Sequence, residues 1–108
     1  MVKKVMKALS EKDYVGLSEC FADECKYIDY CPALNGNENY YVYGKEAVEM
    51  FFRNRFVHNH FEIASPRIED GVTATFFGYY DAPFVYSRLL IEKTDENGKI
   101  MKLVVSPA

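Results

Sequence analysis

The sequence has no tryptophan, only three cysteines and no long apolar run. No stretch approaches the roughly 18 apolar residues that a membrane-spanning helix needs, so we expect no membrane association. Cys20, Cys25 and Cys31 lack the close paired spacing of zinc or redox motifs, and three thiols cannot all pair with one another. We therefore expect reduced thiols in a reducing compartment.

Excess positive charge is also missing. The net charge is −3, and acidic and basic residues are interspersed. Proteins that bind nucleic acid present a basic surface to the phosphates, so nucleic acid is not an expected partner. The cationic residues 1–7 have the spacing of an amphipathic helix and not the pattern of a signal peptide, which predicts a cytoplasmic protein.

Aromatic residues are abundant, with nine Tyr and eight Phe. A tyrosine joins an apolar ring to a polar tip that needs a partner when buried. This surplus favours an aromatic-lined cavity or interface, although a core rich in Phe explains it equally well. The length of 108 residues suits one domain, residues 1–108, without linkers or repeats.

Three helices are predicted in the first half of the chain. The first has apolar residues at three- and four-residue steps: Val2, Val5, Met6 and Leu9. Asp13 is placed to cap a second helix that ends at residues 22–24. Its apolar face comprises Tyr14, Leu17, Cys20 and Phe21. The third begins at Gly44 and carries a stripe of Val48, Phe51, Phe52, Arg55 and Phe56. Arg53 and Arg55 are expected to be solvated or to face a second subunit.

Strands fill most of the remainder. Residues 25–30 predict a strand in which Tyr27 and Asp29 share one face. A loop over residues 31–40 and a short extended piece over 40–43 precede the third helix. Four strands then follow, over 60–68, 72–80, 84–94 and 99–106, with turns at 70–71 and 81–83. Pro66 belongs at an edge or bulge, and Asn97-Gly98 predicts a tight hairpin. Helices followed by a block of strands indicate an α+β fold.

The order of these segments resembles the nuclear transport factor 2-like superfamily, which includes SnoaL-like polyketide cyclases, scytalone dehydratase and ketosteroid isomerase. The matching segments are LSEKDYVGLSECFADEC, KYIDY, GKEAVEMFFRNRF and TDENGKI. The resemblance implies a cone-shaped fold, in which a curved antiparallel sheet packs on three N-terminal helices around a pocket. It also implies a homodimer.

The same resemblance implies roles for particular residues. In the isomerase branch a general base follows the second helix, and the match places Asp29 there. That branch also needs two hydrogen-bond donors for an oxyanion, one of which is a carboxylic acid kept neutral by an apolar site. The corresponding positions here are Leu90 and Val5, which cannot donate. A steroid isomerase is therefore not expected.

Asp29 can be judged from its neighbours as well. With Tyr27 beside it, the carboxyl group lies in an aromatic environment that disfavours its charged form, which suits general acid–base chemistry. Tyr86, Arg88 and Leu90 share a parity, so an inward Leu90 predicts an inward Arg88. Arg88 then pairs with Asp29 or binds a ligand carboxylate; a purely structural pair and a position at the wet rim are the alternatives.

His58, His60 and Glu62 share a parity if their segment is extended, and three such ligands suit a divalent metal. A helix that ends inside the segment breaks that alignment, so no metal site is predicted. His60 is expected in the pocket or at an interface. By analogy with dehydratase-type relatives, it joins Asp29 and Tyr27 as a candidate catalytic set.

Together these features predict a SnoaL-like pocket protein for a compact apolar or aromatic carbonyl compound, without a cofactor. An isomerase, a cyclase or a dehydratase with Asp29 as the base fits this description, but the sequence leaves open whether the protein is an enzyme. The expected ligand contacts are Phe52, Phe56, Tyr86, Arg88 and Leu90. The alternative is a non-catalytic homodimeric module that binds a ligand or a protein.

Overall fold

The computed structural model describes residues 1–80 and 84–108, so the turn predicted at 81–83 lies outside the described residues. Helix α1 (Val2–Glu11) buries Val2, Val5, Met6 and Leu9 as predicted. The predicted cap of α2 (Tyr14–Ser18) is also confirmed, because Asp13 Oδ1 accepts a hydrogen bond from the Gly16 N–H at 2.9 Å. Among the described residues, no helix is both long enough and apolar enough to cross a membrane.

Helix α2 is shorter than predicted. It ends at Ser18, and strand β1 (Phe21–Asp29) begins where the sequence pattern extends the helix. Cys20 and Phe21 are nevertheless buried. The apolar spacing thus continues past the end of the helix, because the first residues of β1 enter the same core.

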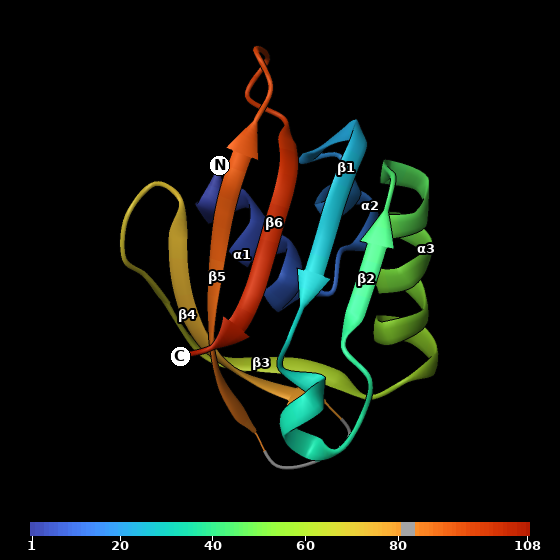
Figure 1. Ribbon diagram of the computed structural model, residues 1–108, viewed down its shortest axis with the longest axis vertical. Coiled ribbons are helices and arrows are strands. Elements are labelled where there is room, and N and C mark those ends of the chain that lie inside the picture. The colour runs from blue at the N-terminus through green and yellow to red at the C-terminus, as the bar shows by residue number, and fades with distance from the viewer. Residues whose placement is uncertain (81–83) are drawn as a thin grey trace.

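Six strands form one sheet in the order β2-β1-β6-β5-β4-β3 (Figure 1). The remaining strands are β2 (Tyr40–Tyr43), β3 (Phe61–Ile68), β4 (Thr73–Tyr80), β5 (Val85–Thr94) and β6 (Ile100–Pro107). Neighbouring strands are antiparallel except for β1 and β6, which are parallel. The four strands predicted after the third helix are confirmed. A 3₁₀-helix, η1 (Pro32–Asn35), occupies part of the predicted loop.

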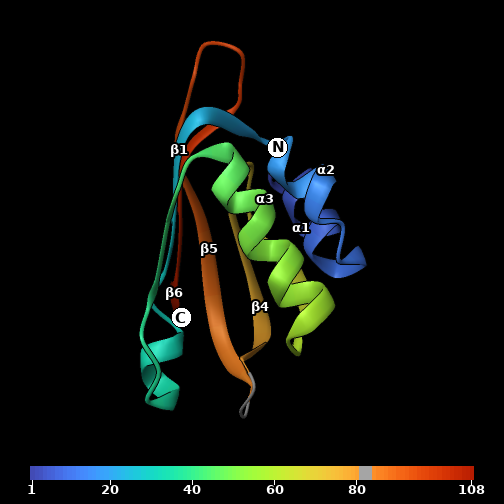
Figure 2. The ribbon, with the colours of Figure 1, turned by 90° about the vertical axis from the view of Figure 1, so that its right-hand side faces the viewer.

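All three α-helices lie on one face of the curved sheet (Figure 2). Helix α3 (Lys45–Arg53) starts after Gly44, whose φ of 96° suits a residue without a side chain. It continues into a π-helical turn, η2 (Asn54–His58). Helix α1 packs against β3 and β4, whereas α3 packs against β1 and β2. The core lies between these helices and the inner face of the sheet.

Two predicted irregularities in the strands are confirmed. The β3–β4 register shifts between Ala64 and Arg67, on either side of Pro66, and Ser65 has a φ of 50°. At the β5–β6 hairpin Gly98 has a φ of 78°, and Asp95 Oδ1 accepts hydrogen bonds from the N–H groups of Asn97 and Lys99. Proline in the first case and glycine in the second therefore stand where the backbone departs from regular pairing.

Candidate functional site

Tyr27 and Asp29 lie side by side on the inner face of β1. The alternation of side chains along a strand sends both into the core, as predicted, and Asp29 has 0% of its surface exposed. The Tyr27 hydroxyl donates a hydrogen bond to Asp29 Oδ2 at 3.1 Å. The Cys31 N–H donates to Asp29 Oδ1 at 2.9 Å. Both carboxylate oxygens therefore face donors, which suits a group that only accepts hydrogen bonds when ionised.

Two further polar residues extend this pair. Cys31 Sγ lies 3.2 Å from Ser87 Oγ, and both side chains are buried. The Ser87 hydroxyl also donates to the Val85 carbonyl at 3.0 Å. The sequence contains signals for both residues: Cys31 stands two positions after an Asp, where turn-type hydrogen bonds form, and Ser87 shares the parity of apolar residues on β5. We call Tyr27, Asp29, Cys31 and Ser87 the interior polar cluster.

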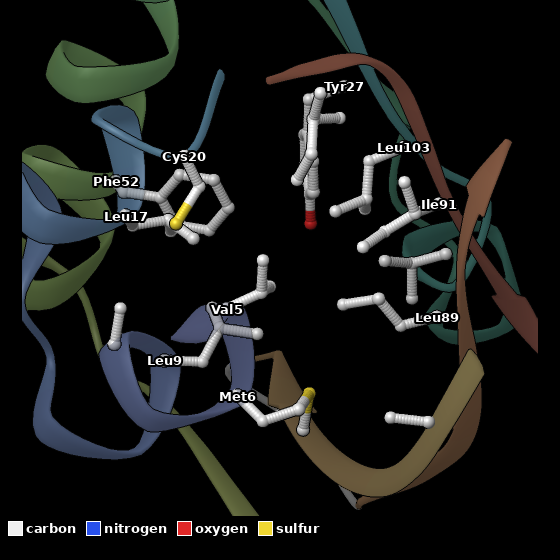
Figure 3. Packing of buried hydrophobic residues seen from close by; sticks show 14 of the residues in the cluster. Val5, Met6, Leu9, Leu17, Cys20, Tyr27, Phe52, Leu89, Ile91 and Leu103 are labelled. Carbon is white, nitrogen blue, oxygen red and sulfur yellow. The ribbon is translucent and has the colours of Figure 1, made fainter. Parts of the chain in front are cut away.

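Aromatic rings surround the phenol end of this cluster. The Tyr27 ring meets Phe52 edge-on, with centroids 4.9 Å apart, and Phe56 lies 5.5 Å from Phe52. Figure 3 shows Tyr27 reaching from β1 into the space between Val5 of α1 and Leu89 on the sheet. The two Phe residues predicted as ligand contacts on the third helix thus lie in one aromatic group with Tyr27.

Burial controls the protonation of Tyr27. Loss of hydration raises the pKa of its phenol well above the ordinary value of 10.0, and the neighbouring Asp29 raises it further. The phenol is therefore protonated at neutral pH and acts as a donor toward Asp29. The arrangement combines a fixed hydrogen-bond donor with a carboxylate acceptor in an apolar surrounding.

Arg55 is a buried cation on the predicted apolar stripe of the third helix. Only 8% of its surface is exposed, so the expectation of a solvated or subunit-facing charge was wrong. Its guanidinium carbon lies 5.2 Å from the centre of the Tyr40 ring and 5.5 Å from that of Phe61. Arg55 belongs to the π-helical turn η2, which continues helix α3.

The inward direction predicted for Arg88 and Leu90 was wrong. Along β5 the buried residues are Val85, Ser87, Leu89 and Ile91, whereas Tyr86, Arg88 and Leu90 are exposed. The β5–β6 pairing agrees with this burial pattern, because the buried Leu89 pairs with the buried Val105 of β6. Tyr86, Arg88 and Leu90 therefore lie on the outer face of the sheet, away from Asp29.

The outward direction of Leu90 changes which residue of β5 could act as an oxyanion donor. Val5 is buried, as its predicted interior position requires, but Leu90 faces outward. Of the described inward residues of β5, Ser87 alone carries a hydroxyl, and that group donates to a backbone carbonyl. The described part of β5 therefore has no inward carboxylic acid of the isomerase kind.

His60 does not join Tyr27 and Asp29. Its side chain is 58% exposed, with Nε2 3.5 Å from Glu62 Oε1 and the ring 4.5 Å from that of Tyr79. The candidate set of Asp29, Tyr27 and His60 is therefore not assembled, because the imidazole lies at the surface and the pair lies inside. Within residues 1–80 and 84–108, no three His, Cys, Asp or Glu side chains are grouped as metal ligands would be.

Known proteins resemble this chain in structure rather than in sequence. No family model matches it, and no curated protein matches its sequence. A SnoaL-like protein of unknown function from Burkholderia thailandensis superposes with a TM-score of 0.67 at 15% identity, covering 99% of this chain and 91% of the other. An NTF2-like protein of unknown function from Cytophaga hutchinsonii gives 0.66 at 13% identity, covering 99% and 86%. The chain has the nuclear transport factor 2-like fold.

A third protein that is similar in structure binds a carotenoid. The orange carotenoid protein of Anabaena, binding canthaxanthin, superposes with a TM-score of 0.67 at 16% identity. The match covers 96% of this chain but 34% of that protein, so it concerns one part of a longer molecule. The predicted α+β architecture and its resemblance to the nuclear transport factor 2-like superfamily are thus confirmed at the level of the fold.

Proposed function

We propose that the protein binds a compact apolar or aromatic carbonyl compound against the interior polar cluster, with the Asp29 carboxylate as its general base. The observation that carries the proposal is the buried Tyr27–Asp29 pair, a donor and an acceptor beside the aromatic rings of the core. Ligand sites of this kind are mostly apolar and have a few convergent polar groups. The likeness of part of a carotenoid-binding protein supports an apolar small molecule as the ligand.

Access to the site depends on the surrounding rings. Neither Tyr27 nor Asp29 lines any of three surface clefts formed by described residues at α1, at the lysines of the outer face and at the start of α3. Tyr40, Phe51 and Phe56 are partly exposed and pack on the core. A ligand reaches Asp29 in this proposal when these aromatic side chains move apart, and it then replaces their contacts with its own apolar surface.

The proposed chemistry is proton transfer next to a carbonyl group. The C–H bond adjacent to the carbonyl breaks, its proton goes to an Asp29 oxygen, and the electron pair moves into the carbonyl to give an enolate. With a β,γ-unsaturated ketone, the protonated Asp29 returns the proton to the γ-carbon of the dienolate, which completes an isomerisation. With a β-hydroxy ketone, it gives the proton to the departing hydroxyl oxygen, which leaves as water and completes a dehydration. Tyr27 positions the carboxylate through its hydrogen bond, and no cofactor is needed.

Two measurements test this proposal. Thermal-shift screening with aromatic ketones and with hydrocarbons of matched shape finds ligands, because a ligand at a hundredfold its Kd adds about 2.7 kcal/mol to stability. Each hit is then incubated with the protein in D₂O, and deuterium uptake beside the carbonyl is followed by NMR. A general base accelerates such exchange by roughly 10²-fold or more, and Asp29→Asn, with a nearly unchanged shape, removes the acceleration.

The outcomes separate binding from catalysis. Stabilisation by ketones without Asp29-dependent exchange contradicts the catalytic role and leaves a ligand-binding protein. If no compound stabilises the protein, the small-molecule proposal itself is wrong.

The alternative function, a homodimeric binding module, is favoured by one other observation. The outer face of the sheet exposes large apolar side chains, among them Phe77, Tyr86 and Leu90, and the Phe77 and Tyr86 rings lie 4.9 Å apart. Light scattering after size-exclusion chromatography tests for a dimer. Tyr86→Glu should dissociate it, whereas Met50→Glu, on an exposed position of α3, should not. A monomer at all concentrations overturns this alternative.

A further inference from the structure

Three lysines stand side by side on the outer face of the sheet. Lys26 of β1 pairs with Lys102 of β6, and Lys102 pairs with Lys93 of β5. Lys26 also pairs with Tyr43 of β2. Directly paired residues on neighbouring strands project from the same face, so Tyr43 and the three lysines form one row across four strands. We call Lys26, Lys93 and Lys102 the lysine row.

Irregular strand pairing surrounds this row. The β1–β6 register shifts between Phe21 and Lys26. The β5–β6 register shifts on both sides of Lys93. Bulges bend a strand and redirect its side chains, and they recur beside functional sites. The lysine row therefore lies where the sheet departs from regular pairing on both sides of β6.

The charges of the row are not balanced. Lys102 Nζ lies 3.4 Å from Glu92 Oε1. Among residues 1–80 and 84–108, no carboxylate lies within ion-pair distance of Lys26 or Lys93. Like charges placed opposite each other on adjacent strands are destabilising. An anion bound at the row would remove this repulsion.

A cleft opens at the row. Its volume is about 560 Å³, and its lining includes all three lysines, Tyr43 and Met101. This volume falls within the range of roughly 300–1,000 Å³ that small-molecule pockets occupy. Asp23 and Glu24 line the same cleft, so its charge is mixed and the lysine row is its cationic part.

Tyr43 adds an aromatic surface to this cationic part. The residue is 60% exposed, and Lys26 Nζ lies 5.9 Å from the centre of its ring. We propose that the cleft binds a small aromatic molecule carrying a phosphate group, with the phosphate on the lysine row and the ring against Tyr43. Lysines bind phosphate as point charges, and aromatic rings stack on one another. This site is separate from the interior polar cluster, because it lies on the opposite face of the sheet.

Phenyl phosphate is the probe for this site, and phenol and inorganic phosphate are its controls. In ¹⁵N-resolved NMR titrations, we expect phenyl phosphate to shift the signals of residues 26, 43, 93 and 102. It should bind more tightly than either control, because each control lacks one of the two recognised groups. Added sodium chloride should weaken the binding, since exposed charges are screened by salt.

Matched variants assign the contacts. Lys26→Gln and Lys93→Gln should each weaken binding by about two- to fivefold, the effect of one exposed charge. Lys3→Gln, which removes the same charge from α1, should leave it unchanged. Tyr43→Leu should weaken the binding of phenyl phosphate but not that of inorganic phosphate. Tyr41→Leu, two positions along β2, should weaken the binding of neither compound.

Several results would overturn the proposal. One is the absence of shifts at the lysine row, and another is an equal effect of Lys3→Gln and Lys26→Gln. A third is tighter binding of a glutamate-rich peptide than of phenyl phosphate at the same residues, which would assign the row to an acidic protein segment. None of these results depends on ligand binding at Asp29.

Discussion

The phenol of Tyr27 and the carboxylate of Asp29 are joined by a hydrogen bond of 3.1 Å inside the core. The two residues are separated by one position on β1, so a single strand holds both groups in register. The buried Cys31 N–H is a second donor to Asp29. The pair thus contributes to stability as well as to the proposed function, and these two contributions can be measured separately.

Replacement of Asp29 should separate shape from hydrogen bonding. Asp29→Ala leaves the Tyr27 hydroxyl and the Cys31 N–H without this acceptor and should lower the free energy of unfolding by about 2 kcal/mol or more. Asp29→Asn keeps one carbonyl oxygen and nearly the same volume, so it should lower the free energy of unfolding by clearly less. Urea unfolding followed by circular dichroism measures both. Equal losses would show that the hydrogen bonds to Asp29 contribute little.

Tyr27 should make stability sensitive to alkaline pH. Its folded pKa is raised above 10.0, so below pH 10.0 the phenol is neutral in both states and its contribution is complete. Above that pH the unfolded phenol ionises first, and the free energy of unfolding falls until the folded pKa is reached. In the Tyr27→Phe variant, the free energy of unfolding should fall less steeply with rising pH than in the wild type.

Tyr41→Phe is the control for this measurement, because Tyr41 is exposed on β2 and should retain the wild-type slope. Identical alkaline slopes for the wild type and Tyr27→Phe would contradict the burial of an un-ionised phenol.

The thiols should be unreactive in the folded protein. All three cysteines are buried, and loss of hydration raises the pKa of Cys20 and Cys25 above 9.0. The thiolate is the reactive form, so an aromatic disulfide reagent at neutral pH should react slowly with native protein and rapidly after unfolding in guanidinium. Rapid reaction of one thiol in the native state would show that the core opens near that cysteine.

A pair of Phe→Ala variants tests the two faces of the sheet. Phe52 is 2% exposed and contacts Tyr27, so Phe52→Ala should cost about 3–5 kcal/mol in unfolding free energy. Phe77 is 41% exposed on the outer face, and Phe77→Ala should cost about 1 kcal/mol or less. Guanidinium unfolding of both variants checks the prediction. A large cost at Phe77 would indicate that the outer face is covered in solution.

Periodicity predicted the architecture because each main element has a clear apolar face. The spacing of Val2, Val5 and Met6 fixes α1, and the Asn97-Gly98 turn places the last hairpin. The end of α2 was not predicted, since Cys20 and Phe21 fit the helical spacing and are also buried in the turn and strand that follow the helix. Local pattern cannot distinguish these two conformations when both lead into the same core.

The site was predictable in part. Tyr27 and Asp29 followed from strand alternation, but the parity predicted for β5 was wrong because the resemblance placed Leu90 inside. Arg88 and Glu92 share the parity of Leu90, and this charge pattern already indicated an outward face. The stripe that Arg55 shares with Phe52 and Phe56 indicated its burial, whereas its charge led to the opposite expectation of a solvated residue.

The most direct test of the proposed function is NMR of protein with ¹³C-labelled tyrosine rings, titrated with a ketone that stabilises it. Binding at the interior polar cluster should shift the ring signals of Tyr27, assigned through Tyr27→Phe, and leave those of the exposed Tyr41 in place. Shifts confined to surface tyrosines, with Tyr27 unchanged at saturation, would contradict a small-molecule site at Asp29.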